Sequence, residues 1–94
     1  MSDLNDLYYY AQVVEHGGFA PAGRALNIPK SKLSRRIAVL EARLGVRLIQ
    51  RSTRRFNVTE IGQAYYARCK AMLIEAEAAQ TLIDNAHAEP CGTL

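Results

Sequence analysis

The stretch SKLSRRIAVLEARL, residues Ser31 to Leu44, decides the fold. On a helix of about 3.6 residues per turn, its large apolar residues recur at spacings that place them on one narrow stripe. This stripe, which can be buried, consists of Leu33, Ile37, Leu40 and Leu44. The opposite face is small apart from one arginine, and consists of Ser31, Arg35, Ala38 and Ala42. Lys32, Arg36 and Arg43 follow one flank, where they could meet phosphates. Such a helix fits the DNA major groove, although a solvated basic surface helix is the alternative.

The composition predicts one folded domain with a local excess of positive charge. The chain has 94 residues, of which 49% are hydrophobic, and a net charge of +3. From Lys30 to Arg55 there are nine of the 12 lysines and arginines, against Glu41 alone. A concentration of this kind suits a phosphate backbone. A scattered solvated face is the alternative.

Other sequence signals predict a cytoplasmic protein and give no indication of a cofactor. No apolar run approaches the roughly 20 residues that cross a bilayer, and the first residues, MSDLNDLYYY, lack the pattern of a signal peptide. Cys69 and Cys91 have no metal-type spacing. We therefore expect a reduced, cytoplasmic protein with no membrane segment, metal or cofactor, in which Cys69 is a small buried or half-buried side chain.

Two predicted helices precede the central stretch. The first begins with Ser2 or Asp3 as its N-cap and ends near His16. Its expected core stripe is Leu4, Leu7, Tyr10, Ala11 and Val14. The second spans Phe19 to Leu26, with Phe19, Ala22, Ala25 and Leu26 expected to be buried. The turn from Asn27 to Pro29 then leads into the central helix, which completes a helix-turn-helix.

The segment after Gly45 predicts a β-hairpin wing. Two short extended runs, 46–49 and 56–58, surround a polar and basic tip. The wing residues that could enter a minor groove are Arg51, Thr53, Arg54 and Arg55. An ordinary surface loop is the alternative. The expected fold is therefore mainly α: a winged helix-turn-helix (three helices plus a short β-hairpin wing) followed by a long dimerisation helix.

That last helix is predicted from Thr59, a good N-cap, to about His87. Its length of about 42 Å exceeds what a domain of this size can cover. It must project, and its apolar stripe then needs a partner, so we infer a helix-mediated dimer. The candidate dimer residues are Tyr9, Val13, Tyr65, Met72, Ala76, Ala79, Leu82 and Ile83.

These features together resemble the N-terminal DNA-binding domain of LysR-type transcriptional regulators. The resemblance covers essentially the whole chain and rests on Gly17, Phe19, Ala22, Leu26, Leu33-Ser34-Arg35, Ile37, Leu40-Glu41, Leu44-Gly45, Leu48, Arg51, Arg55, Thr59 and Gly62. It implies a DNA-binding domain at 1–58, a linker and dimerisation helix at 59–88, and a hinge at 89–94. A domain absent from this chain would follow and bind a small-molecule effector. The resemblance further implies a homodimer, or a tetramer in the full-length protein.

The resemblance also assigns DNA contacts to Ser31, Ser34 and Arg35 and to the wing arginines. This chain departs from the family pattern where Pro29-Lys30-Ser31-Lys32 stands for the usual Ser-Gln-Pro-Ala. The departure predicts altered base preference and stronger phosphate contact. The expected recognition-helix contacts are Lys30, Ser31, Lys32, Ser34, Arg35 and Arg36.

The predicted function is sequence-specific binding of double-stranded DNA. A dimer would read an interrupted inverted repeat, with recognition helices in major grooves and wings toward minor grooves, and so control transcription. An enzyme is not indicated, because His16 and His87 are isolated and no glycine-rich phosphate loop is present. The alternative is a helix-mediated protein-interaction module that does not bind specific DNA.

Overall fold

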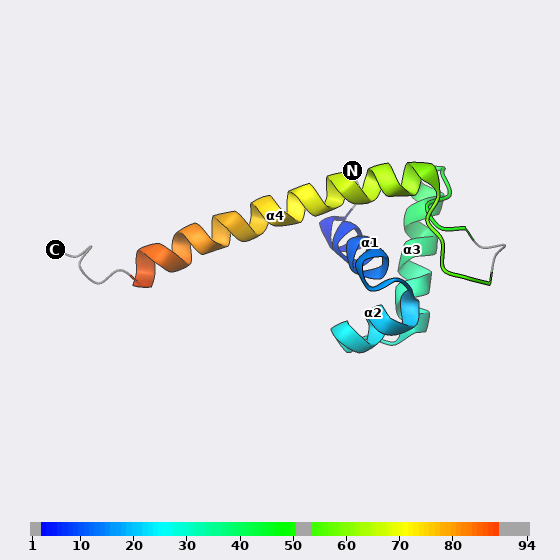
Figure 1. Ribbon diagram of the computed structural model, residues 1–94, viewed down its shortest axis with the longest axis horizontal. Helices are drawn as coiled ribbons and strands as arrows, with labels where there is room; N and C mark the ends of the chain where they lie inside the picture. Colours follow the sequence, from blue (N-terminus) through cyan, green and yellow to red (C-terminus); the bar gives the residue numbers. More distant parts are fainter. Residues whose placement is uncertain (1–2, 51–53, 89–94) are drawn as a thin grey trace.

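The computed structural model describes residues 3–50 and 54–88, and these form four helices. They are α1 (Leu4–His16), α2 (Phe19–Leu26), α3 (Lys30–Leu44) and α4 (Glu60–Ala88). The first three pack together at one end, and α4 packs on α1 and then projects far beyond (Figure 1). The molecule measures 61 × 26 × 19 Å. The predicted mainly α order, helix-turn-helix and projecting helix are therefore confirmed.

Local caps explain where the helices begin and end. The Asp3 side chain accepts a hydrogen bond from the Asn5 amide, at 2.9 Å, and starts α1 as predicted; the alternative N-cap, residue 2, lies outside the described residues. Left-handed residues end the first three helices: Gly17 (φ 78°), Asn27 (φ 59°) and Gly45 (φ 73°). The helix α3 begins one residue earlier than predicted.

The core lies between α1, α3 and the first turns of α4. Its buried residues are Tyr10, Ala11, Val13, Ala22, Leu33, Ile37, Leu40, Leu48, Ile49 and Cys69. The stripe of α3 is thus buried as predicted, except that Leu44 is half-buried. Burial raises the pKa of the Cys69 thiol to about 11, so this cysteine stays protonated at neutral pH. It is a packing residue, in agreement with the prediction.

Three predicted environments on α1 and α2 are wrong. Leu4 is 57% exposed and Ala25 is exposed, so neither contributes to the core. Val13 is completely buried, which leaves it no surface for a partner subunit. Val13 is buried because α1 packs against α2, α3 and α4 at once, within one chain. Tyr9, predicted beside it at the dimer interface, is half-buried beneath the guanidinium of Arg36.

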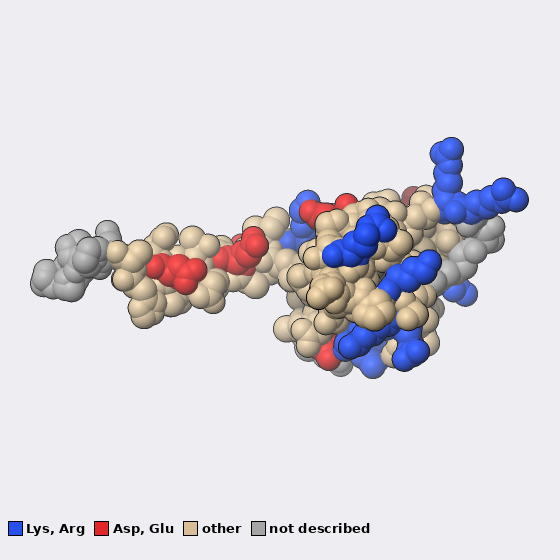
Figure 2. Space-filling view, turned by 90° about the horizontal axis from the view of Figure 1, so that it is seen from below, with Lys and Arg blue, Asp and Glu red and all other residues tan. Residues whose placement is uncertain are grey.

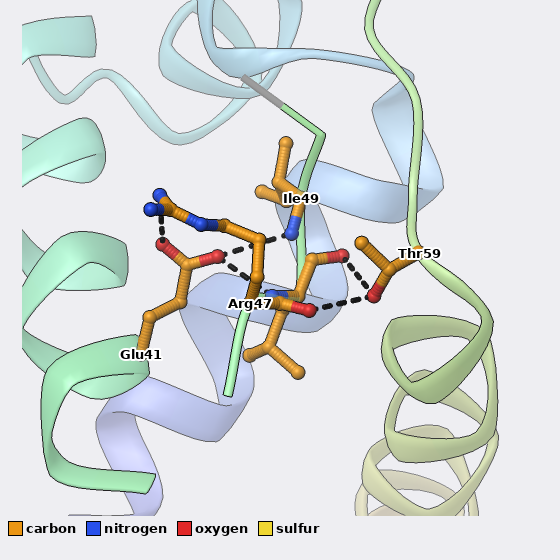
Figure 3. A network of polar contacts seen from close by, with 5 residues as sticks. Glu41, Arg47, Ile49 and Thr59 are labelled. Atoms are coloured by element: carbon orange, nitrogen blue, oxygen red, sulfur yellow. Dashed lines mark hydrogen bonds and ion pairs between the residues drawn. The ribbon is translucent and has the colours of Figure 1, made fainter. Parts of the chain in front are cut away.

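The predicted wing hairpin is reduced to one antiparallel bridge, Ile49 with Val58, and the described residues hold no longer strand. The Glu41 carboxylate accepts hydrogen bonds from the amides of Leu48 (2.7 Å) and Ile49 (3.0 Å), and lies 3.9 Å from Arg47 (Figure 3). Backbone hydrogen bonds on both sides of the bridge, from the Gln50 amide to the Asn57 carbonyl (2.8 Å) and from the Thr59 amide to the Leu48 carbonyl (3.0 Å), also join the two runs. The predicted tip residues Arg51 and Thr53 lie outside the described residues, as does the predicted hinge, 89–94.

A tight joint fixes α4 to the domain. The Thr59 hydroxyl accepts from the Gly62 amide at 3.0 Å, which confirms Thr59 as the N-cap, and it donates to the Arg47 carbonyl at 2.7 Å. The Tyr10 hydroxyl donates to the Gly62 carbonyl at 2.8 Å. Burial raises the Tyr10 pKa above its usual range, which keeps this donor protonated. We call Tyr10, Thr59 and Gly62 the α4 joint.

Replacing Gly62 with alanine should destabilise the domain. A Cβ atom at this position would collide with the Leu48 carbonyl oxygen and would lie 2.8 Å from the Tyr10 hydroxyl. Alanine gains about 1 kcal/mol in helix propensity, but overpacking against backbone costs about 1–3 kcal/mol or more. We expect a net loss of about 1–2 kcal/mol in the free energy of unfolding, measured by urea denaturation.

The matched control for Gly62 is Gly17→Ala. Gly17 has a left-handed backbone, but a Cβ atom added there would meet no other atom within 4 Å, so the cost of this substitution is conformational alone. Substitution at Gly62 should also disturb the Tyr10 environment, seen by tyrosine fluorescence, which Gly17→Ala should leave unchanged. An unaltered urea midpoint for Gly62→Ala would show that the joint is looser than the structure indicates.

Candidate nucleic-acid interface

One groove collects most of the predicted DNA-binding residues that the structure describes. It has a volume of about 480 Å³ and lies between the beginning of α2, the beginning of α3 and the segment after α3. Its lining includes Lys30, Ser31, Ser34, Arg54 and Arg55, which the sequence predicted from two separate segments. We call it the α2–α3 groove.

Aromatic and polar residues complete the α2–α3 groove. Phe19 and Phe56 meet edge to face with ring centroids 6.1 Å apart, which joins the beginning of α2 to the segment after α3. Gln50 and Ala20 also line the groove. Sequence reasoning missed these four as site residues. The only available signal was the position of Gln50 and Phe56 on either side of the basic tip.

Positive charge gathers at this end of the molecule. Seen from below, most of the lysines and arginines in view lie over the globular part, whereas the charged residues in view along the projecting part of α4 are aspartates and glutamates; a few acidic side chains also lie on the globular part (Figure 2). The exposed cations here include Lys30, Lys32, Arg35, Arg54 and Arg55. The concentration predicted from the sequence is therefore a feature of the folded surface, and it favours a polyanion.

The beginning of α3 is a second favourable feature for anions. Pro29, at the N-cap, provides no side-chain hydrogen bond, and the first turn of α3 contains no acidic residue. Lys30 and Lys32 stand there instead, beside the positive end of the helix dipole. Ser31 and Arg35 are exposed on the outer face, as predicted, and Ser34 is half-buried. The beginning of α3 therefore lacks the side-chain acceptor and the negative charge that normally offset the positive end of a helix dipole. A phosphate bound there would stabilise it.

The flank of α3 is engaged with α1, which the sequence did not predict. Arg36 places its Nε atom 3.3 Å from Asp6 Oδ1, and its guanidinium lies 4.9 Å from the Tyr9 ring centroid. Arg43 lies 3.8 Å from Asp6 Oδ2. Asp6 is almost fully buried, at 6% exposed. These ion pairs depend on how α1 packs on α3, and no local sequence pattern predicts them.

The projecting part of α4 exposes an apolar surface. Of the predicted dimer residues, five lie exposed there: Met72, Ala76, Ala79, Leu82 and Ile83. Tyr65 is half-buried instead, with its ring centroid 5.6 Å from that of Tyr10 in the same chain. A hollow of about 310 Å³ between α1 and α4 continues the apolar surface from Met72 to Leu4 and Tyr8. Among the described residues, no helix has the length and hydropathy to cross a membrane.

Comparison with known proteins gives consistent matches. Residues 4–63 match the model of the "bacterial regulatory helix-turn-helix protein, lysR family". An HTH-type transcriptional regulator of Xanthomonas campestris pv. campestris is 40% identical over 92 residues, covering 98% of this chain and 27% of that protein. The HTH-type transcriptional activator AaeR of Escherichia coli is 37% identical over 94 residues, covering 100% of this chain and 30% of that protein.

Solved structures agree with these matches. The crystal structure of the BenM_DBD/catB site 1 DNA complex superposes with a TM-score of 0.85 at 28% identity, covering 94% of this chain and 98% of that chain. The present chain spans less than a third of the length of the curated relatives named above.

Proposed function

Because this chain belongs to the lysR family of bacterial regulatory helix-turn-helix proteins, we propose that it binds double-stranded DNA and regulates transcription. The α2–α3 groove carries the proposal, since it joins the beginning of the recognition helix α3 to the basic segment after it. A groove of this kind suits a DNA backbone that passes between a major-groove helix and a neighbouring basic segment. The similar BenM structure was solved as a DNA complex, which supports this interpretation.

The proposed contacts divide into two groups. Ser31, Ser34 and Arg35 would read base edges in the major groove, while Lys30 and Lys32 would contact phosphates. Arg54 and Arg55, together with the tip residues Arg51 and Thr53, would approach the backbone or the minor groove. Residues 1–58 would form the DNA-binding domain, and 59–88 the linker and dimerisation helix. Two chains would pair through the exposed apolar surface of α4.

The direct test is binding to random duplex DNA across a range of salt concentrations, followed by selection of preferred sites. A regulator of this kind should bind random DNA with a strong salt dependence and enrich a common sequence motif. The alternative, a protein-interaction module that pairs through α4, predicts self-association without either result. Selection that returns no motif would favour this alternative.

Arg35→Ala should weaken binding to the selected site much more than binding to random DNA. Arg35 is exposed on the outer face of α3, where a guanidinium can bind the edge of a guanine. We expect a loss of about 1–3 kcal/mol on the selected site, measured by fluorescence anisotropy on both DNAs. Arg68→Ala, on α4, removes the same charge and serves as the control. Equal losses on selected and random DNA would show that Arg35 contacts phosphate only.

A further inference from the structure

Asp6 forms ion pairs with two of the nine lysines and arginines that lie between Lys30 and Arg55. The Asp6 side chain is 8% exposed, whereas those of Arg36 and Arg43 are 32% and 49% exposed. Each carboxylate oxygen faces a different arginine, at 3.3 Å and 3.8 Å. Arg36 is held a second time by the Tyr9 ring. One buried carboxylate on α1 therefore holds two cations of the recognition helix.

The two arginines also lie away from the α2–α3 groove. Arg36 and Arg43 are seven residues apart, so they share one side of α3. Together with Asp6 they line a separate hollow of about 290 Å³, and no residue that lines this hollow also lines the groove. Arg35, on the exposed outer face of α3, lies at the edge of the same hollow and not in the groove. Lys30, Ser31 and Ser34 line the groove instead. The recognition helix thus has a groove side and an α1 side.

Moving either arginine toward a phosphate would disturb the buried carboxylate. A buried charge that loses a partner is destabilised, and Asp6 would then keep only one of the two arginines that face its carboxylate oxygens. The affinity of a protein for DNA through phosphates depends on how many cations displace counterions. Cations that stay with Asp6 do not add to that number.

We propose that Asp6 is a specificity-determining residue that positions Arg36 and Arg43 against α1 and withholds them from the DNA backbone. By lowering the number of phosphate contacts, it reduces affinity for DNA of any sequence, while the base contacts proposed for Ser31, Ser34 and Arg35 are kept. The selectivity for the preferred site is therefore higher than the arginine content of α3 alone would give. This inference rests on the DNA-binding function proposed above.

The test is a salt titration of binding to random duplex DNA. Asp6→Asn keeps the shape of the side chain but removes its charge, so the arginines are released. The slope of log K against log salt should become steeper by about 0.9 to 1.8. Glu75→Gln, on the projecting part of α4, makes the same change of net charge and should leave the slope unaltered. Selectivity for the preferred site should fall in Asp6→Asn alone.

Arg43→Gln is made both in the wild-type chain and in Asp6→Asn. The comparison separates the positioning of Arg43 by Asp6 from an effect of Asp6 on the stability of the fold. In the wild-type chain this substitution should change the slope little, whereas in Asp6→Asn it should reduce the slope by about 0.9. Lys32→Gln should reduce the slope by about 0.9 in either background. Thermal unfolding followed by circular dichroism is measured for each variant, so that slopes are compared only between variants that are fully folded across the salt range.

Two results would overturn the inference. One is a wild-type slope that falls as much with Arg43→Gln as with Lys32→Gln; this comparison decides the matter even if Asp6→Asn does not fold. The other is a folded Asp6→Asn whose slope equals that of wild type. Both leave the proposed function intact, because wild type still binds DNA. Absence of salt-dependent binding by wild type would instead overturn the proposed function.

Discussion

The Ile37→Ala variant should unfold with a free energy about 2–5 kcal/mol lower than that of the wild-type chain. Ile37 is completely buried at the centre of the α3 stripe, in a core shared with Tyr10, Leu33 and Leu40. Truncation removes apolar contacts and leaves a cavity that helices held by their neighbours cannot fully close. Urea denaturation followed by circular dichroism measures the difference.

Val39→Ala is the matched control for Ile37. It truncates another β-branched residue of α3, but Val39 is 48% exposed and should change stability by about 0.5 kcal/mol or less. If both variants unfold at the urea concentration of wild type, the stripe does not hold α3 in place. Because a typical small domain is stable by about 5–15 kcal/mol, Ile37→Ala is expected to lower the folded fraction at elevated temperature and with it the DNA affinity.

A complete inverted repeat should bind the chain about 10²–10⁴-fold more tightly than a single half-site. In a dimer joined by α4, binding of one domain presents the other at high effective concentration. The half-sites are expected to lie about one helical turn apart, roughly 34–36 Å, or a multiple of it. Titration of full and half sites, with light scattering of the free protein, measures the ratio and the oligomeric state together.

Ile83→Asp should abolish most of this advantage. Ile83 is 51% exposed on the projecting part of α4, and a carboxylate there would have to be desolvated between two helices. Thr81→Asp places the same charge on the opposite side of α4 and should leave the dimer intact. A wild-type chain that stays monomeric at high micromolar concentration and binds both DNAs equally would contradict pairing through α4.

The helices were predictable because their signals are local. Each helix cap acts through its own side chain or backbone conformation, which does not depend on distant residues. The caps are Asp3, Gly17, Asn27, Gly45 and Thr59. The apolar stripe of α3 likewise lies within a single segment of the sequence and can be recognised from its spacing. These features were sufficient to predict the helix-turn-helix and the long final helix.

The predictions that failed depend on contacts between segments far apart in the sequence. Val13 is buried within an α1 that packs against α2, α3 and α4 at once, and this packing is a property of the whole fold. The hydrogen bonds that Glu41, on α3, accepts from the amides of Leu48 and Ile49 also join separate segments and were not predicted. The ion pair of Arg36 with Asp6 was not predicted for the same reason, whereas the predicted contact of Arg36 with DNA stays a prediction.

The candidate site was predictable in part. The basic residues were visible as a cluster in the sequence, and the structure brings Lys30 and Arg54 to one groove. Gln50 and Phe56 were missed, because their place beside α2 follows from the contact between Phe19 and Phe56. Charge can be counted along a chain, whereas the shape of a groove depends on tertiary packing.

The α4 joint makes the final helix a lever arm. At about 1.5 Å per residue, its 29 residues extend about 43 Å from the joint. A tilt of one degree at Gly62 would therefore displace the far end by about 0.8 Å, and about five degrees would displace it by roughly one base-pair step. In the proposed dimer, a few atoms around one glycine would therefore fix how precisely the two recognition helices can be spaced along DNA.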